Sequence, residues 1–237
     1  MARERLRVRA RRLVWEYLIV VVGVLTALAV DNWNSERVDR GLERYYLSGL
    51  VADLDSATAM VVSNRDRSNQ IGSAALEVLG WIRGTSAPAS VSELESVIRR
   101  TTSGWPIPPE SSTWTEMNQR GHVQLIDNDA LRQLTIRDME DLERLRGLLL
   151  QARDMGSSEV RTSGIYRALP PEYWAGHRAL EGADLARGME VLRETEAIPL
   201  GLEDLIVNEN RRRNFLVVFE STAARLSESL RAGLGPS

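Results

Sequence analysis

The stretch LVWEYLIVVVGVLTALAV, residues 13–30, decides the fold class of the N-terminal region, because its 18 residues carry a single charge, Glu16. As an α-helix it would be about 27 Å long at a rise of 1.5 Å per residue, which is close to the roughly 30 Å hydrocarbon core of a bilayer. Glu16 lies at the end next to a basic cluster, where its carboxylate reaches headgroups and water. We therefore expect one transmembrane anchor within residues 13–34.

Aromatic residues stand at both ends of this stretch, with Trp15 and Tyr17 at one end and Trp33 at the other. Amphipathic rings of this kind prefer headgroup depth and form the interface belts of membrane proteins. Inside the stretch, Gly23 and Ala27 are small and four residues apart, so that another membrane helix can approach closely. The expected helix-contact face consists of Val20, Gly23, Ala27 and Val30.

The first 12 residues set the expected orientation. They carry six arginines and one glutamate, a net charge of +5. By the positive-inside rule, such a tail stays in the cytoplasm and residues 35–237 cross the membrane. We expect a bacterial inner-membrane protein with a cytoplasmic tail (1–12) and a periplasmic helical domain (35–237). A cleaved signal peptide is the alternative, since the small pair Ala27 and Ala29 suits signal peptidase; we expect the uncleaved anchor.

Composition limits the classes of function. The whole chain has a net charge of −3 and the tail +5, so residues 13–237 carry −8 and nucleic acid is not an expected partner. The chain has no cysteine, which excludes disulfides, thiolate catalysis and thiolate metal sites. Stability must therefore come from packing, and about 200 residues are enough for one domain with its own core.

Apolar residues recur at helical spacing through most of the exported region, and no strand pattern is present. The fold class predicted is all-α: one N-terminal transmembrane helix followed by a periplasmic helical bundle. Helix is expected to continue from the anchor to residue 83, with bends at Gly41, Gly49 and residues 63–70. Further helices are expected near residues 92–100, 113–120, 130–155, 183–195 and 202–230, with irregular segments at 84–90, 106–109 and 164–182.

Some positions in these helices have specific expected roles. Ser92 and Glu95 have the spacing of a capping box, and Asn128 or Asp129 can cap the helix that follows. Expected core positions are Leu47, Leu50, Val51, Leu54, Leu76, Leu79 and Ile82 in the first helix, Leu131, Leu134, Leu142, Leu145 and Leu149 in the middle one, and Phe215, Val218, Phe219, Thr222, Leu226 and Leu230 in the last.

Two stretches resemble a large group of bacterial single-span envelope proteins with a basic N-terminal tail and a helical exported region. They are LTALAVDNWNSER, residues 25–37, and SSTWTEMNQRGHVQLIDNDALRQL, residues 111–134. Together with the basic tail and the rest of the anchor, residues 1–24, they cover about a quarter of the chain. The resemblance implies an envelope location and a helical fold, and it brings no activity and no catalytic residues with it.

Few residues suggest chemistry. Ser112, His122 and Asp127 contain the groups of a hydrolase triad, but no strained nucleophile turn is present and turn or cap roles are expected instead. Only two histidines occur, so a metal site would need carboxylates. No catalytic, cofactor-binding or metal-binding residue is therefore expected. The run Arg211 to Arg213 is expected on a solvated helix face, with an acidic partner or a lipid headgroup as the alternative.

Three tryptophans, Trp105, Trp114 and Trp174, lie in or beside proline-rich breaks. In exposed loops they would be partner contacts, because tryptophan is enriched among binding hot spots. In a small bundle they would plug the core. Both interpretations stay open at this stage.

The expected function is a non-enzymatic, membrane-anchored accessory subunit that stabilises a larger bacterial membrane protein complex. Its expected partners are membrane lipids and other membrane subunits, for example those of an energy-converting assembly such as a photosynthetic reaction-centre or antenna complex. The first alternative is a periplasmic module, anchored to the inner membrane, that binds a ligand or a protein. The second alternative is an unrecognised hydrolase.

The charge of the tail yields a topology prediction. A reporter enzyme that is active only in the periplasm, fused after Ser237, should be active, because the +5 tail holds the N-terminus inside. Neutral replacements of all six tail arginines should give mixed orientation. Activity of a cytoplasm-dependent reporter at the same position, with the tail intact, would show the opposite topology.

Overall fold

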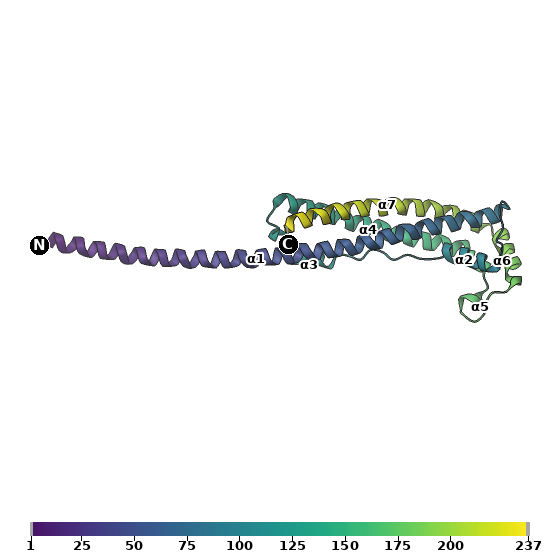
Figure 1. Cartoon of the computed structure of the whole chain (residues 1–237), viewed down its shortest axis with the longest axis horizontal. Helices are drawn as coiled ribbons and strands as arrows, with labels where there is room; N and C mark the ends of the chain where they lie inside the picture. Colours follow the sequence, from purple (N-terminus) through teal and green to yellow (C-terminus); the bar gives the residue numbers. More distant parts are fainter. Residues whose placement is uncertain (1, 236–237) are drawn as a thin grey trace.

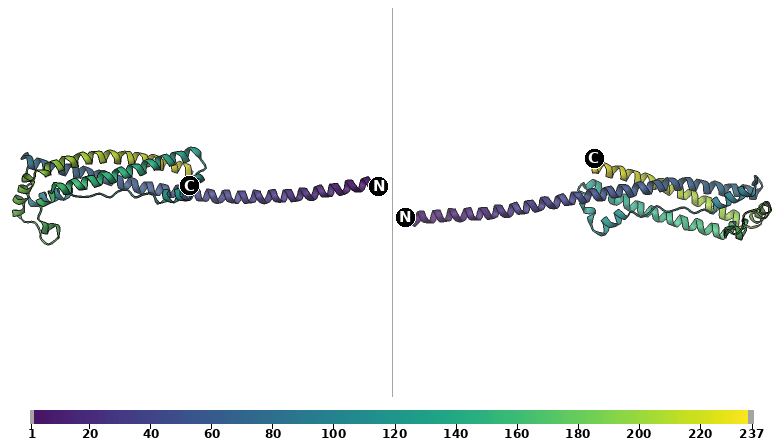
Figure 2. Two further views of the ribbon diagram at one scale, coloured as in Figure 1. Left: turned by 180° about the vertical axis from the view of Figure 1, so that it is seen from behind. Right: turned by 60° about the horizontal axis from the view of Figure 1, so that its bottom comes forward.

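A computed structural model describes the backbone of residues 2–235. It also describes the side chains of these residues, except those of residues 2–16, 19, 157, 159 and 161. Within residues 2–235 the chain forms seven α-helices, two short 3-10 helices and no strand, so the all-α fold class is confirmed. The molecule is elongated, and its first helix extends far beyond the bundle on the N-terminal side (Figures 1 and 2).

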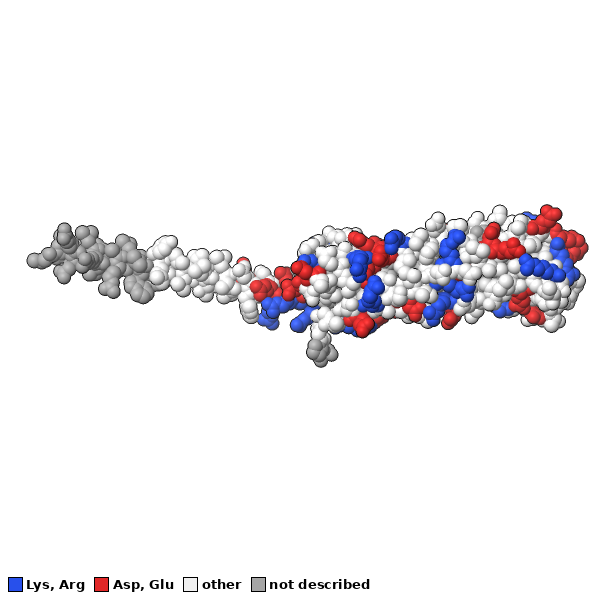
Figure 3. Space-filling view, turned by 90° about the horizontal axis from the view of Figure 1, so that it is seen from above, with Lys and Arg blue, Asp and Glu red and all other residues white. Residues whose placement is uncertain are grey.

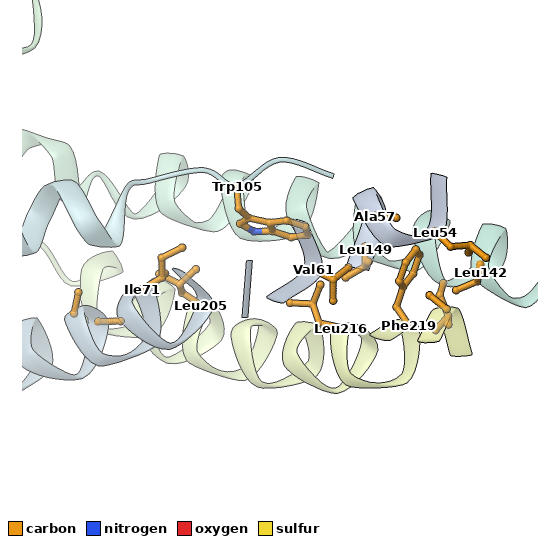
Figure 4. Close-up of a cluster of buried hydrophobic side chains, with 14 of the residues drawn as sticks. Leu54, Ala57, Val61, Ile71, Trp105, Leu142, Leu149, Leu205, Leu216 and Phe219 are labelled. Carbon is orange, nitrogen blue, oxygen red and sulfur yellow. The ribbon is translucent and has the colours of Figure 1, made fainter. Parts of the chain in front are cut away.

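Three long helices form the body of the bundle: α1 (Ala2–Arg83), α4 (Asp129–Ser163) and α7 (Ala197–Leu234). Helix α7 packs along both α1 and α4 (Figure 1). Each of the three contributes aliphatic or aromatic side chains to one continuous core, and burial of such a side chain contributes about 1.5–3 kcal/mol. Figure 4 shows part of this core, with Leu54 and Val61 from α1, Leu142 and Leu149 from α4, and Leu216 and Phe219 from α7.

An extended segment, residues 103–111, occupies the groove between α1 and α4, and we call it the strap. Its prolines lack the N–H group that a helix needs, in agreement with the irregular segment expected at residues 106–109, and the structure shows that the segment is extended. Carbonyl oxygens of the strap accept hydrogen bonds from both helices: Asn64 Nδ2 donates to Pro106 at 2.8 Å and Arg146 Nε donates to Pro108 at 3.0 Å. The strap thus takes the place that a fourth helix would have in a regular bundle.

Short elements close the two ends of the bundle. Helices α2 (Val91–Thr101), α5 (Pro171–Trp174) and α6 (Gly182–Glu194), together with the 3-10 turn η2 (Ile165–Ala168), lie at the end away from the N-terminus (Figure 1). Helix α3 and the 3-10 turn η1 lie at the opposite end, where α1 enters the bundle. Their bounds are Ser112–Gln119 and His122–Leu125.

The expected bends in α1 are absent, because the polar stretch at residues 63–70 is held by tertiary contacts. Asn64 bonds to the strap, and Ser68 donates to Glu209 of α7. Both side chains are buried and satisfied, so the helix continues through them to Arg83. The prediction of bends at Gly41 and Gly49 was wrong as well, since the helix continues without a break at both.

The helix ends agree in part with the sequence. The start of α2 is capped by Ser90, whose Oγ accepts from the Glu93 N–H at 3.2 Å, so the capping box at Ser92 was placed two residues too late. Asn128 is confirmed as the cap of α4, with Oδ1 accepting from the Leu131 N–H. Helix α4 continues eight residues beyond the expected end and stops at Gly164, whose φ of +74° suits glycine.

Two expected core positions are wrong. Leu76 is 58% exposed and Val218 is 48% exposed, whereas the other named core positions are buried or packed against the core. At 100° per residue, the buried α1 positions 71, 74, 75 and 78 share one face, and Leu76 lies about 150° from its centre, on the opposite side of the helix. Val218 lies outside the face that α7 presents to its neighbours. A few leucines at helical spacing therefore do not by themselves identify the buried face.

In the part of the chain that the structure describes, no helix is both long and apolar enough to cross a membrane. Of the expected anchor, the side chains of residues 13–16 and 19 lie outside the described part, as do those of the arginine-rich tail.

The contact between α6 and η2 generates a stability prediction. A Cβ at Gly188 would lie 2.7 Å from the Ala168 carbonyl oxygen, a backbone atom that cannot move alone, and 2.6 Å from Leu94 Cδ2. We expect Gly188→Ala to lower the free energy of unfolding by about 1–3 kcal/mol. The matched control is Gly72→Ala in α1, where nothing lies within 4 Å and helix propensity favours alanine by roughly 1 kcal/mol. Denaturant titration measures both, and equal stability of the two variants would contradict the close packing of α6.

Candidate functional site

A cavity of about 620 Å³ lies at the end of the bundle that carries α2, α5 and α6. Its walls come from the start of the strap, from α4 and α7, from Ile71 of α1 and from the η2–α5 segment. Three aromatic side chains line it: Trp105, Tyr166 and Trp174. A volume of this size falls in the range of small-molecule sites, roughly 300–1,000 Å³.

The polar part of the cavity is a buried ion pair on α7. Arg212 is only 2% exposed and contacts the carboxylate of Glu209, one turn earlier on the same helix. The guanidinium carbon lies 4.0 Å from the ring centroid of Trp105, which covers it as a cation–π partner. On the other side, Ser68 Oγ of α1 donates to Glu209 Oε2 at 2.5 Å. The cluster therefore joins α1, α7 and the strap.

Burial controls the protonation of this pair. Loss of hydration lowers the pKa of Arg212 to about 10, against the opposing effect of Glu209, so the guanidinium stays charged at neutral pH. Loss of hydration also raises the pKa of Glu209, while Arg212 and the Ser68 hydroxyl act in the opposite direction. Arg212 Nη2 contacts Glu209 Oε2, whereas Arg212 Nε has no hydrogen-bond acceptor within the described part of the chain. A buried donor without an acceptor is costly, about 1–3 kcal/mol, and more when it is charged.

The expectation of a solvated face for the arginine run was wrong for Arg212. Arg211 is exposed, and Arg213 is partly exposed and bonded to Asn69. Arg212 instead stands four residues before Leu216, which puts it on the buried face of α7. That spacing is visible in the sequence, but a charge run usually marks a solvated face, and the shielding ring of Trp105 comes from a distant segment.

The three tryptophans named in the sequence separate into two groups. Trp105 and Trp114 are 6% and 5% exposed and pack in the core, in agreement with the core alternative for these two. Figure 4 shows Trp105 among the buried side chains of the neighbouring helices. Trp174 keeps 41% exposure at the cavity, where its Nε1 donates to the Tyr166 carbonyl at 3.0 Å. Only Trp174 has a face open to a partner.

The imagined hydrolase triad is not assembled. His122 Nδ1 lies 2.8 Å from the Tyr46 hydroxyl, and the Asp127 backbone N–H donates to Glu43. No hydrogen bond joins Ser112, His122 and Asp127 to one another among the described residues. Within the same part of the chain, no group of three or more metal-ligating side chains comes together.

The residues named for membrane contact lie on the projecting part of α1. Val20 and Val30 are 63% and 58% exposed, and Gly23 and Ala27 between them are exposed as well. Of the expected aromatic belt, Tyr17 and Trp33 are 73% and 60% exposed, and the side chain of Trp15 lies outside the described part. The bundle covers none of the described members.

Comparison with protein-family models, curated proteins and solved structures finds no match to this chain.

The buried pair generates a prediction with a pH dependence. Arg212→Met leaves Glu209 buried without its cation and should lower the free energy of unfolding by about 3–5 kcal/mol. Without Arg212 the pKa of Glu209 rises further, so the folded state holds a proton that the unfolded state releases. The loss of stability should therefore be smaller near pH 5 and grow as the pH rises to 8.

The control is the double variant Arg212→Met with Glu209→Gln, which removes both charges. It should recover much of the loss and show no growth of the loss with pH. Denaturant titrations at several pH values measure all three proteins. A double variant that is no more stable than Arg212→Met would show that Glu209 does not cause the loss.

Proposed function

We propose that this protein is a non-enzymatic accessory subunit, anchored to the bacterial inner membrane by the N-terminal part of α1, with its helical bundle in the periplasm. The anchor docks against lipids and against helices of a larger membrane complex, and the bundle braces that complex from outside. The proposed anchor includes residues 13–16 and 19, whose side chains lie outside the described part.

One observation carries the proposal: α1 presents exposed apolar side chains on all sides over residues 17–30. The large ones are Tyr17, Leu18, Val20, Val22, Val24, Leu25, Leu28 and Val30, each about half exposed or more. In Figure 3 a stretch of uncharged residues, drawn white, follows the grey tail, and charged residues appear only farther along the helix, towards the bundle. A helix that is apolar all round is not stable in water and needs lipid or other helices around it.

The next part of α1 supports an interfacial position. From Asp31 to Arg44 charged residues return on the helix, with an exposed Arg40–Glu36 ion pair, and Leu42 is the first residue that packs against the core. Twelve residues from Val30 to Leu42 span about 18 Å of helix. Because α1 is continuous there, the bundle would stand off the membrane on a stiff helical stalk, in reach of the exposed surface of neighbouring subunits.

The alternative of an anchored ligand-binding module also has a specific observation in its favour, which is the cavity beside Arg212. The two functions are compatible, since the cavity and the exposed apolar segment lie at opposite ends of the molecule. From Val30 to Ile71 the helix rises about 60 Å. Neither function needs a reactive group.

The proposed contact face generates a prediction about partners. Gly23→Leu should detach the protein from its membrane partners, because a leucine at this position keeps a neighbouring helix at a distance. Leu18→Ala, which lies in the same segment, and Gly41→Leu, which makes the same substitution among charged residues, should both retain the partners. All three variants should remain in the membrane fraction.

The measurement is the yield of co-purified membrane subunits at equal expression, after extraction of native membranes in a mild detergent. If the Gly23→Leu variant keeps its partners as well as the two controls do, the anchor is passive and the bundle alone makes the contact. If the wild-type protein is recovered from the soluble fraction, the anchoring itself is wrong.

A further inference from the structure

The cavity beside Arg212 combines the charged side chains of Arg212 and Glu209 with aliphatic and aromatic lining residues. This combination supports an inference that does not depend on the membrane anchor. Half of the cavity's described lining residues are aliphatic or aromatic, with Trp105, Tyr166 and Trp174 supplying flat faces. Trp174 is 41% exposed, so one aromatic wall stands at the opening. Walls of this kind suit the apolar body of a small molecule, and flat rings pack well against aromatic side chains.

The charges at the cavity favour an anion. Among the described lining residues three are arginines, Arg153, Arg167 and Arg212, and one is acidic, Glu209. Arg153 forms an ion pair with Asp154, which is not among the described lining residues; Arg153 Nη2 lies 3.2 Å from Asp154 Oδ1. Arg167 is exposed and forms no ion pair with a described residue. The described lining residues therefore carry an excess of positive charge at neutral pH, because a guanidinium does not lose its proton there.

Arg212 gives the independent observation that a ligand belongs here. It is a charged side chain 2% exposed at the cavity wall, and its Nε lacks an acceptor among the described residues. Glu209 Oε2 accepts from Ser68 and contacts Arg212 Nη2, so it does not satisfy Nε. A buried cation that is held by a ring face and is short of acceptors gains from an added anionic oxygen.

We propose that this cavity binds a small organic carboxylate with a flat apolar body, whose carboxylate is held by the field of Arg212 and Arg167 and whose body lies between Trp105, Tyr166 and Trp174. The carboxylate supplies negative charge beside Arg212, whose Nε lacks an acceptor among the described residues. The aromatic faces supply contact area at low cost in side-chain entropy.

The test uses a pair of probes that differ only in charge, indole-3-acetate and its neutral isostere indole-3-acetamide. Both are titrated by calorimetry into the full-length protein in detergent, with micelles alone as the blank. We expect the carboxylate to bind at least about tenfold more tightly than the amide, as an interaction with a buried cation requires. Equal affinity for the two probes, or no binding of either to the folded protein, would overturn the proposal.

A cavity-filling variant locates the binding. Gly156 of α4 is buried and lines the cavity, and a Cβ there would meet only Leu205 Cδ1, at 3.7 Å. Gly156→Leu should therefore weaken binding of indole-3-acetate at least about tenfold by occupying the space of the ligand. The matched control, Gly147→Leu, makes the same change on the exposed side of the same helix, where nothing lies within 4 Å, and should bind as wild type does.

Two substitutions of exposed residues keep the test decisive if Gly156→Leu does not fold. Trp174→Ala removes an aromatic wall and should weaken both probes, whereas Arg167→Gln removes a charge and should weaken the carboxylate more than the amide. Circular dichroism melting confirms that each variant is folded. Unchanged affinity in Trp174→Ala and Arg167→Gln, or in a folded Gly156→Leu, would place the binding elsewhere and contradict the assignment.

Discussion

The buried guanidinium of Arg212 is the constraint on which the half of the bundle next to α2, α5 and α6 depends. A charge this deep requires compensation, and the chain supplies it from three directions: Glu209 on the same helix, Ser68 through that carboxylate, and the ring of Trp105. These groups come from α7, α1 and the strap, so the requirement of one side chain fixes the position of all three segments. Hydrophobic contacts alone would permit α1 and α7 to slide or rotate against each other, because aliphatic packing tolerates several arrangements.

The strap has an effect that a fourth helix would not have. A helix satisfies its own backbone, whereas an extended segment offers its carbonyl groups to the neighbours, and Asn64 and Arg146 use them. The strap is also thinner than a helix and carries few large side chains. Trp105 at its start is the one bulky group that reaches the centre of the bundle, and the space beside that ring is the cavity. The cavity is therefore a consequence of building one side of the bundle from an extended segment.

Helix α1 belongs to two environments. Over residues 17–30 it presents apolar side chains that nothing in the described structure covers, and from Leu42 onwards it is one wall of the core. No proline or left-handed glycine interrupts it, so the two parts are mechanically continuous. Whatever surrounds the first part, lipid or protein, sets the orientation of the second. This continuity couples the two proposed properties of the molecule, a docked anchor and a cavity at the far end.

The sequence by itself determined the elements that depend on local physics. Hydrophobic periodicity predicted the all-α class and the approximate bounds of the helices, and the prolines predicted an irregular segment at residues 106–109. Asn128 was one of two caps that the sequence offered, beside Asp129, and the structure selects it. The sequence did not reveal that α1 is unbroken through residues 63–70, because the polar side chains of Asn64 and Ser68 favour a break until distant groups satisfy them.

Only the tertiary structure decided the candidate site. Arg212 stands in a run of three arginines, and the local pattern of such a run is that of a solvated face. Its burial is tolerable only because Trp105, more than 100 residues earlier in the chain, covers the guanidinium, and because Ser68 supports its partner Glu209. Contacts between residues so far apart leave no signal in local spacing. They arise from the way in which α1, the strap and α7 pack, and that packing is a property of the whole fold.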